Sequence, residues 1–212
     1  ADRIEQLAGD FRVVDALDQR ISASAYEANG KIYFVYTGTP VGGDFTEVRY
    51  VVTDAATNAI LDQGTISDPT HDYYQGSIAV NSLGQVVIGY NRSGRDPTDG
   101  NITFAAQRFT TDASGHLVLE GGELVLKVSL VDDYHNGSLY GQPAAGRQRW
   151  GDYSAVSLDP TDENVFWAIG EYAREYNNAA GGHPGGTGAS RWSTWVAGIQ
   201  FASNIGAVPE PQ

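Results

Sequence analysis

A repeated pattern of strand, turn and strand constrains this chain more than any other feature. Each copy begins with a short stretch of small residues, turns at polar residues, and continues into a more apolar stretch with an aromatic residue at its end. The three copies are residues 21–38 (ISASAYEANGKIYFVYTG), 76–94 (GSIAVNSLGQVVIGYNRSG) and 153–172 (YSAVSLDPTDENVFWAIGEY). Alternation with period two between Gly, Asn, Asp and Pro residues predicts half-buried β-strands joined by tight turns.

Further strands follow each copy. A third strand is expected from Glu47, from Asn101 and from Ser193, and a fourth strand over residues 59–67 and 123–130. The expected unit is therefore a four-stranded antiparallel meander whose slim first strand suits a crowded central axis. This is the arrangement of a β-propeller blade. The sequence predicts an all-β protein with about three such blades, and a β-sandwich is the alternative with a similar number of strands.

Residues 1–201 are expected to form a single propeller, with residues 202–212 as a C-terminal linker. The third unit lacks a fourth strand, whereas residues 10–18 (DFRVVDALD) have the pattern of an extra outer strand. Residues 1–9 could form one or two helical turns at most. Because propellers use four or more blades, three blades alone should not close a ring. We therefore expect either a longer propeller or completion by a second copy or another chain.

Composition limits the possible partners. The chain has 26 acidic and 13 basic side chains, a net charge of −13, and no run of Lys or Arg, which argues against nucleic acid as a partner. It has no Cys, so disulfides, thiolate catalysis and Cys-ligated zinc are excluded. No run of 18 apolar residues is present, so we expect no membrane span. The chain contains no Met, which fits removal of a signal peptide, cutting of a longer precursor or trimming.

Two segments near the C-terminal end resemble a known group of proteins. Residues 149–173 (RWGDYSAVSLDPTDENVFWAIGEYA) and 192–201 (WSTWVAGIQF) are similar to the final blades of secreted bacterial β-propeller proteins with sialidase-like architecture. The resemblance covers roughly residues 21–201 and implies a fold, without implying an activity. The arginine triad and the Ser-x-Asp-x-Gly-x-x-Trp box typical of sialidases are not recognisable in this chain.

The last residues carry a second resemblance. Val208, Pro209, Glu210 and Pro211 (VPEP) are similar to the start of a PEP-CTERM sorting signal, although the membrane helix and basic cluster that follow it in that family are not in this sequence. The resemblance implies export and processing at the cell envelope of a Gram-negative bacterium, and a secreted or cell-surface location. A Pro-rich tail that arose by chance is the alternative.

Aromatic and charged residues lie just ahead of two predicted inner strands, in HDYYQGS and QRWGDYS. The candidate ligand-binding residues are Tyr73, Tyr74, Arg149, Trp150, Asp152 and Tyr153. Aromatic rings can stack on sugars, and guanidinium and carboxylate groups can bind hydroxyls. The repetition of this pattern ahead of two units favours a structural interpretation, in which Trp150 fills a gap between blades while Arg149 and Asp152 pair with each other, and ligand contact at the propeller face is the alternative.

Candidate catalytic and metal-binding residues are fewer. Asp152 and Glu171 could supply the two carboxylates of a glycoside hydrolase; in the structural interpretation Asp152 binds backbone amides and Glu171 pairs with an arginine. The sequence predicts no cofactor, with calcium as the alternative. Its candidate ligands are the Asp-rich turns with Asp96, Asp99, Asp159 and Asp162, which match no EF-hand spacing and are also ordinary turn sequences.

The sequence as a whole favours an exported binding or structural module that engages carbohydrate, protein or copies of itself. The alternative is a hydrolase or lyase that acts on polysaccharide. A pocket with two opposed carboxylates would favour the enzyme, whereas an aromatic-lined face would favour the binding module.

Overall fold

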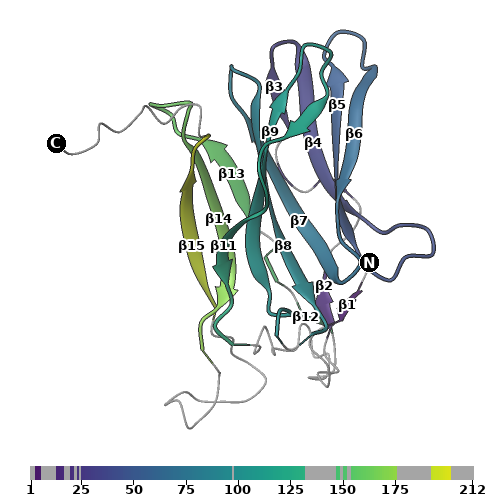
Figure 1. The fold of residues 1–212 in the computed structure, drawn as a ribbon, viewed down its shortest axis with the longest axis vertical. Coiled ribbons are helices and arrows are strands. Elements are labelled where there is room, and N and C mark those ends of the chain that lie inside the picture. Colours follow the sequence, from purple (N-terminus) through teal and green to yellow (C-terminus); the bar gives the residue numbers. More distant parts are fainter. Residues whose placement is uncertain are drawn as a thin grey trace, which may run out of the picture.

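The structure is a computed structural model, and it describes residues 3–5, 13–16, 20–21, 23, 25–96, 98–131, 147–148, 150–151, 154–175 and 192–201. Every regular element in these residues is a β-strand, which confirms the predicted all-β class (Figure 1). No described segment forms a helix that is long and apolar enough to cross a membrane.

The first sheet is a four-stranded antiparallel meander. It consists of β3 (Tyr26–Ala28), β4 (Lys31–Gly38), β5 (Glu47–Asp54) and β6 (Ile60–Ile66), paired in chain order. Asn29 and Gly30 form the first turn with φ of 52° and 70°, the left-handed conformation that an Asn-Gly hairpin turn requires. The first repeat and its two following strands were therefore predicted with nearly the observed boundaries.

The middle sheet has the same topology. β7 (His71–Val80), β8 (Gln85–Gly94) and β9 (Thr103–Thr111) pair in order, and the position of a fourth strand is shared by β10 (Leu117–Leu119) and β11 (Leu124–Val128). Both of these short strands pair with β9, β11 through a bulge between Val125 and Lys127. The predicted fourth strand over 123–130 corresponds to β11, and β10 was not predicted.

The last sheet has three described strands: β13 (Ala155–Leu158), β14 (Phe166–Ala173) and β15 (Trp192–Ile199). A separate small sheet contains β1 (Arg3–Glu5), β2 (Val13–Asp15) and β12 (Arg147–Gln148). Two expectations for the N-terminal region were wrong here. Arg3–Glu5 is a strand and not a helical turn, and β2 pairs with its neighbours β1 and β12 instead of serving as an outer blade strand.

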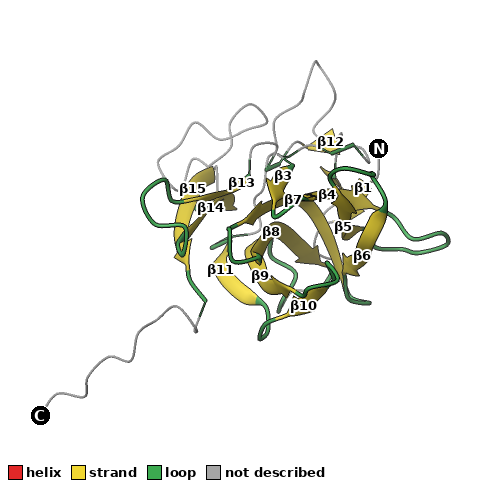
Figure 2. Ribbon diagram, turned by 90° about the horizontal axis from the view of Figure 1, so that it is seen from above, coloured by secondary structure: helices red, strands yellow, loops and turns green. Residues whose placement is uncertain are grey.

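The three large sheets stack face to face, with the middle sheet between the other two (Figure 2). All ten residues of β7 and nine of the ten in β8 are buried, because both faces of these strands are covered. One apolar cluster joins the first and middle sheets and includes Tyr33, Val48 and Ile88. A second cluster joins the middle and last sheets and includes Val87, Phe104 and Phe166.

Glycines allow the sheets to approach closely. A Cβ atom on Gly76 of the middle sheet would lie 2.8 Å from the Val48 side chain of the first sheet. A Cβ atom on Gly170 of the last sheet would lie 2.6 Å from the Phe104 ring of the middle sheet. The sheet contacts therefore consist of bulky side chains seated on glycine positions of the neighbouring sheet.

Hairpin turns of the three sheets meet at one end of the stack. The Asn29 side chain of the first sheet donates to the Ser82 carbonyl (2.8 Å), and the Ser82 hydroxyl donates to Glu163 of the last sheet (2.6 Å). The equivalent turns of the three units are thus neighbours in space. This agrees with the prediction of three repeated blade-like units, which in the described residues form an open stack and not a closed ring.

Candidate functional surfaces

The predicted ligand-binding aromatic residues lie in the interior. Tyr73 and Tyr74 point to opposite faces of β7 and are 6% and 0% exposed, and Trp150 is 2% exposed. Tyr74 and Trp150 pack together in a third apolar cluster at the end of the stack where β7 begins. In this arrangement no sugar ring can stack on them. Arg149, Asp152 and Tyr153, like Val208–Pro211, lie outside the described residues.

A hydrogen-bonded group surrounds Trp150 and was not predicted from the sequence. Gln75 donates from its amide to the Trp150 carbonyl and accepts from Asn91 (3.1 Å). Gln75 occupies a bulge in β7 with a positive φ of 53°, which no local sequence signal indicates. Glu171 accepts from the Gly151 amide (3.1 Å), so a backbone amide is a partner of this candidate catalytic carboxylate.

The Asp-rich turns use their carboxylates internally. Asp96 accepts hydrogen bonds from the amide and hydroxyl of Thr98, and Asp159 accepts the same pair from Thr161, all at 2.7–2.8 Å. Asp162 likewise accepts from Asn164. Within the described ranges, no three His, Cys, Asp or Glu residues gather in a way that could hold a metal ion.

A third turn of this Asp-Pro-Thr type starts at Asp68 and is more deeply placed. Besides Thr70, Asp68 accepts from the Tyr73 hydroxyl (2.8 Å) and lies 2.9 Å from Nδ1 of His71. Burial alone would raise the pKa of Asp68, but the hydrogen bonds from Thr70 and Tyr73 and the nearby His71 ring lower it to about 2. The repeated DPT tripeptide is the sequence signal that could have pointed to this turn.

The Asp68 turn continues into a network at the end of the middle sheet where β7 begins and β8 ends. Nε of Arg92 donates to Glu123 at 2.8 Å, and Nη1 of Arg92 lies 3.5 Å from Asp99, which in turn lies 3.3 Å from Nε2 of His71. Burial, with the charge of Glu123, raises the pKa of Tyr90, whose hydroxyl is 3.5 Å from that carboxylate. Asp99, a calcium candidate, is therefore a partner of two side chains in an ion-pair network.

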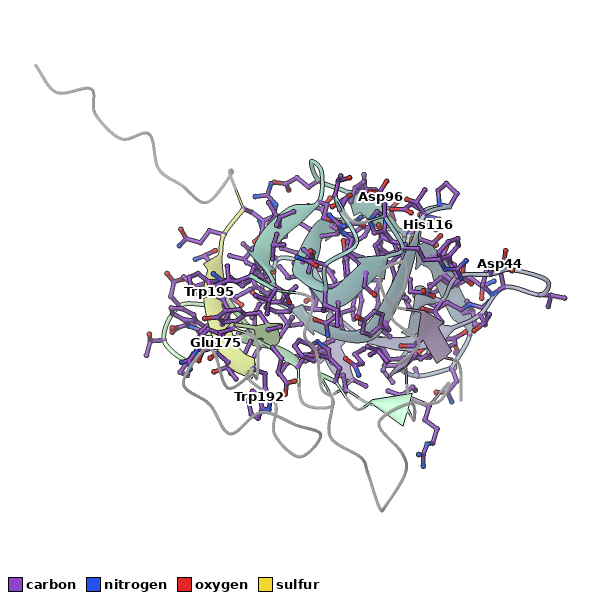
Figure 3. The ribbon with its side chains drawn as sticks, turned by 90° about the horizontal axis from the view of Figure 1, so that it is seen from below. Asp44, Asp96, His116, Glu175, Trp192 and Trp195 are labelled. Carbon is purple, nitrogen blue, oxygen red and sulfur yellow. The ribbon has the colours of Figure 1, made fainter. Side chains whose placement is uncertain are left out.

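The outer face of the last sheet is apolar and open. Register places Trp167 opposite Gly198 and Ile169 opposite Val196 on this face. The exposed fractions of Trp167, Ile169 and Val196 are 42%, 36% and 55%. Trp192, 48% exposed, continues the same face toward the start of β15, at the boundary of the molecule (Figure 3). No described strand packs on this face. Contiguous exposed apolar surface of this kind often marks a binding site.

The outer face of the first sheet is the opposite end of the stack. Register places on it an apolar group, which consists of Ile32, Phe34, Tyr36, Val51 and Ile60. Ile60 is 61% exposed, and the others are half-buried or nearly buried beside one another. A hollow of about 340 Å³ opens here between Tyr36, Val51 and Gln63, with the Arg49–Glu47 ion pair (2.6 Å) on its lining.

Comparison with known proteins adds no family. No family model matches the chain, and no curated protein matches it.

Proposed function

We propose that this chain is a binding and assembly module whose working surfaces are the two outer faces of the sheet stack. The observation that carries this proposal is the open face of Trp167, Ile169 and Val196 on the last sheet. Between the sheets of the stack, the apolar faces are covered by the neighbouring sheet. Leaving this one in water is costly unless a partner covers it.

Electrostatics favour binding over nucleophilic catalysis for the described titratable groups. A tyrosine nucleophile needs a lowered pKa or a nearby base. Burial and the hydrogen bond to Asp68 instead raise the pKa of Tyr73, and burial raises that of Tyr90. Asp68, with a pKa near 2, is a permanent anion at neutral pH and a poor proton acceptor.

We also propose that the module acts outside the cytoplasm, at the cell envelope or in the extracellular matrix. The VPEP tetrapeptide supports this location, and the absence of Cys is compatible with it. Fractionation of the cells that make the protein tests it. We expect the chain in the envelope or culture medium, and a purely cytoplasmic signal would contradict the proposal.

A binding experiment with matched variants tests the proposed activity. Val196→Arg places a charge on the open face, and Val125→Arg, on β11 with a nearly equal exposed fraction of 54% against 55%, is the control. Immobilised protein is offered a neutral glucan, an acidic polysaccharide and the chain itself in biolayer interferometry. We expect binding of at least one probe, with a loss of about tenfold or more in Val196→Arg alone.

One further readout separates the proposal from its alternative. Reducing ends released from either polysaccharide should stay at the level of a protein-free control, because a binding module does not hydrolyse its ligand. Binding of no probe, or an equal loss in Val125→Arg, would contradict the proposed role of the open face.

A further inference from the structure

The outer face of β13–β15 and the outer face of β3–β6 could pack against each other in the way that the stacked sheets pack inside the molecule. We infer that a second copy of this chain covers them: the outer face of β13–β15 in one copy packs on the outer face of β3–β6 in the other. The contact occurs twice in a closed pair. This inference rests on the proposed function and names the partner of the same surfaces.

The internal contacts of the stack show what such a contact needs. Each buries apolar side chains from paired strands and seats a bulky group on a glycine, as Val48 does at Gly76 and Phe104 at Gly170. The open faces offer the same parts. Trp167 and Trp192 are bulky groups on the last sheet, and the hollow beside Tyr36 is a recess on the first sheet.

The order of groups along the two faces also agrees. The end of β4 meets the start of β7, where Thr37 accepts from the Gln75 amide, and the end of β14 meets the end of β11, where the Ala173 amide donates to Ser129. From this shared end of the stack, the last sheet presents Glu171 and then Ile169 with Val196.

From the same end, the first sheet presents Glu47, then Arg49 with Tyr36, then Phe34 with Val51. When the sheets stack at matching heights, the Glu171 carboxylate lies within about one row of the Arg49–Glu47 ion pair. The apolar rows then meet apolar rows.

Local charge opposes this contact, but only through a few groups. The net charge of −13 repels two copies, and the described side chains of the two outer faces include the Arg49–Glu47 pair, Glu27, Glu171, and Asp159, which accepts from the Trp167 indole N–H at 2.8 Å. The burial of the apolar rows must outweigh this repulsion. A contact between different faces closes only when its rotation returns to the start. Two copies of a three-sheet stack give six sheets, which lies within the range of known propellers.

The test uses one variant on each face and one matched control for each. Val196→Arg alters the last sheet and Ile60→Arg the first, and Val125→Arg and Leu83→Arg are controls with nearly equal exposure. Native mass spectrometry and light scattering give the mass of each. We expect the wild type and both controls at twice 22.7 kDa, and each face variant at 22.7 kDa.

Mixing the two face variants makes the test specific for contact between unlike faces. The Val196→Arg chain keeps its first-sheet face and the Ile60→Arg chain keeps its last-sheet face, so one contact between unlike faces can still form. A 1:1 species should therefore form in the mixture. If Ile60→Arg alone still pairs, the last-sheet face binds itself and the inference is wrong. A ladder of higher masses, or a wild type that stays at 22.7 kDa at all concentrations, would also overturn it.

The outcomes distinguish this inference from the proposed function. A monomeric chain that binds a polysaccharide through Val196 would retain the function and remove the second copy as the occupant. A monomeric chain that binds no probe would remove both.

Discussion

Three Asp-Pro-Thr turns show how the same three residues serve different ends in different places. At Asp96 and Asp159 the carboxylate closes an exposed turn by accepting from the threonine two residues later. At Asp68 the same turn also binds Tyr73 and His71, which line the edge of the contact between the first and middle sheets. The stability that one aspartate provides therefore depends on what packs beside it.

The lowered pKa of Asp68 predicts a contribution to the free energy of unfolding that is lost at low pH. Because the pKa falls to about 2 in the folded state, the stabilisation is complete above the unfolded value near 4 and is lost as the pH falls through about 2. Asp68→Asn should lower the free energy of unfolding at pH 7 by on the order of 1–2 kcal/mol, allowing for its one-third exposed side chain. Urea denaturation across this pH range measures it.

Asp96→Asn is the control, since it alters an equivalent but exposed turn. Its effect should be smaller, and the fall of stability between pH 4 and 2 should persist in it. If the free energy of unfolding of Asp68→Asn still fell by the wild-type amount between pH 4 and 2, Asp68 would not be the source of the acid sensitivity.

At the residue level, the sequence singled out Tyr73 and Tyr74 but did not indicate that they are buried. The aromatic and polar residues around Tyr74 and Trp150 were singled out, but the alternation of β7 alone does not reveal that both of its faces are covered. The burial of Tyr73 and Tyr74 depends on the neighbouring sheets, which are distant in sequence. Gln75 and Asn91 were missed because a bulge with positive φ, and not a motif, brings them to Trp150.

At the level of the elements, the stack depends on glycines where sheets meet. Gly170→Ala would place a Cβ atom 2.6 Å from the Phe104 ring, and the fully buried ring has little room to move. We expect a loss of about 1–3 kcal/mol in the free energy of unfolding, from overpacking. Denaturant midpoints with unchanged m-values would measure it.

Gly198→Ala is a matched control on the adjacent strand. Its Cβ atom would meet Trp167 at 3.4 Å on the open face, which is ordinary contact, so stability should change little or rise slightly. Equal losses in the two variants would indicate a general intolerance of β14 and β15 and not a contact between sheets.

The strands and their order were largely predictable, because each repeat carries period-two alternation and explicit turn residues. The same local signals failed at the N-terminal end. Arg3–Glu5 and Val13–Asp15 are short strands held by pairing with each other and with Arg147–Gln148, and no local periodicity encodes that pairing. β10 was missed because three residues are too few for an alternating pattern.

For the whole molecule, charge and apolar surface act in opposite directions. The net charge of −13 opposes association, whereas the open sheet faces favour it. Raising NaCl from about 0.02 M to about 0.5 M should therefore strengthen the pair, because salt screens the repulsion and leaves apolar burial intact. Sedimentation velocity measures the dissociation constant, and weakening by salt would indicate that ion pairs dominate the contact.

The open faces also explain which part of the candidate surface was predictable. The incomplete ring followed from counting three units, so a partner at the ends of the stack was expected from the sequence. The identity of the exposed side chains was not predictable from the sequence. Alternate residues of a strand point to opposite faces, and the face that stays exposed depends on the side on which the neighbouring sheet packs.

Photo-crosslinking from the last sheet tests the central claim most directly. Val196→p-benzoylphenylalanine is prepared in ¹⁵N-labelled chain and mixed with unlabelled wild type, so that crosslinks between copies are distinguished by mass. We predict crosslinks from position 196 to residues 31–66 of the other copy, in β4–β6. Crosslinks between copies confined to residues 155–199, or only within one copy, would contradict it.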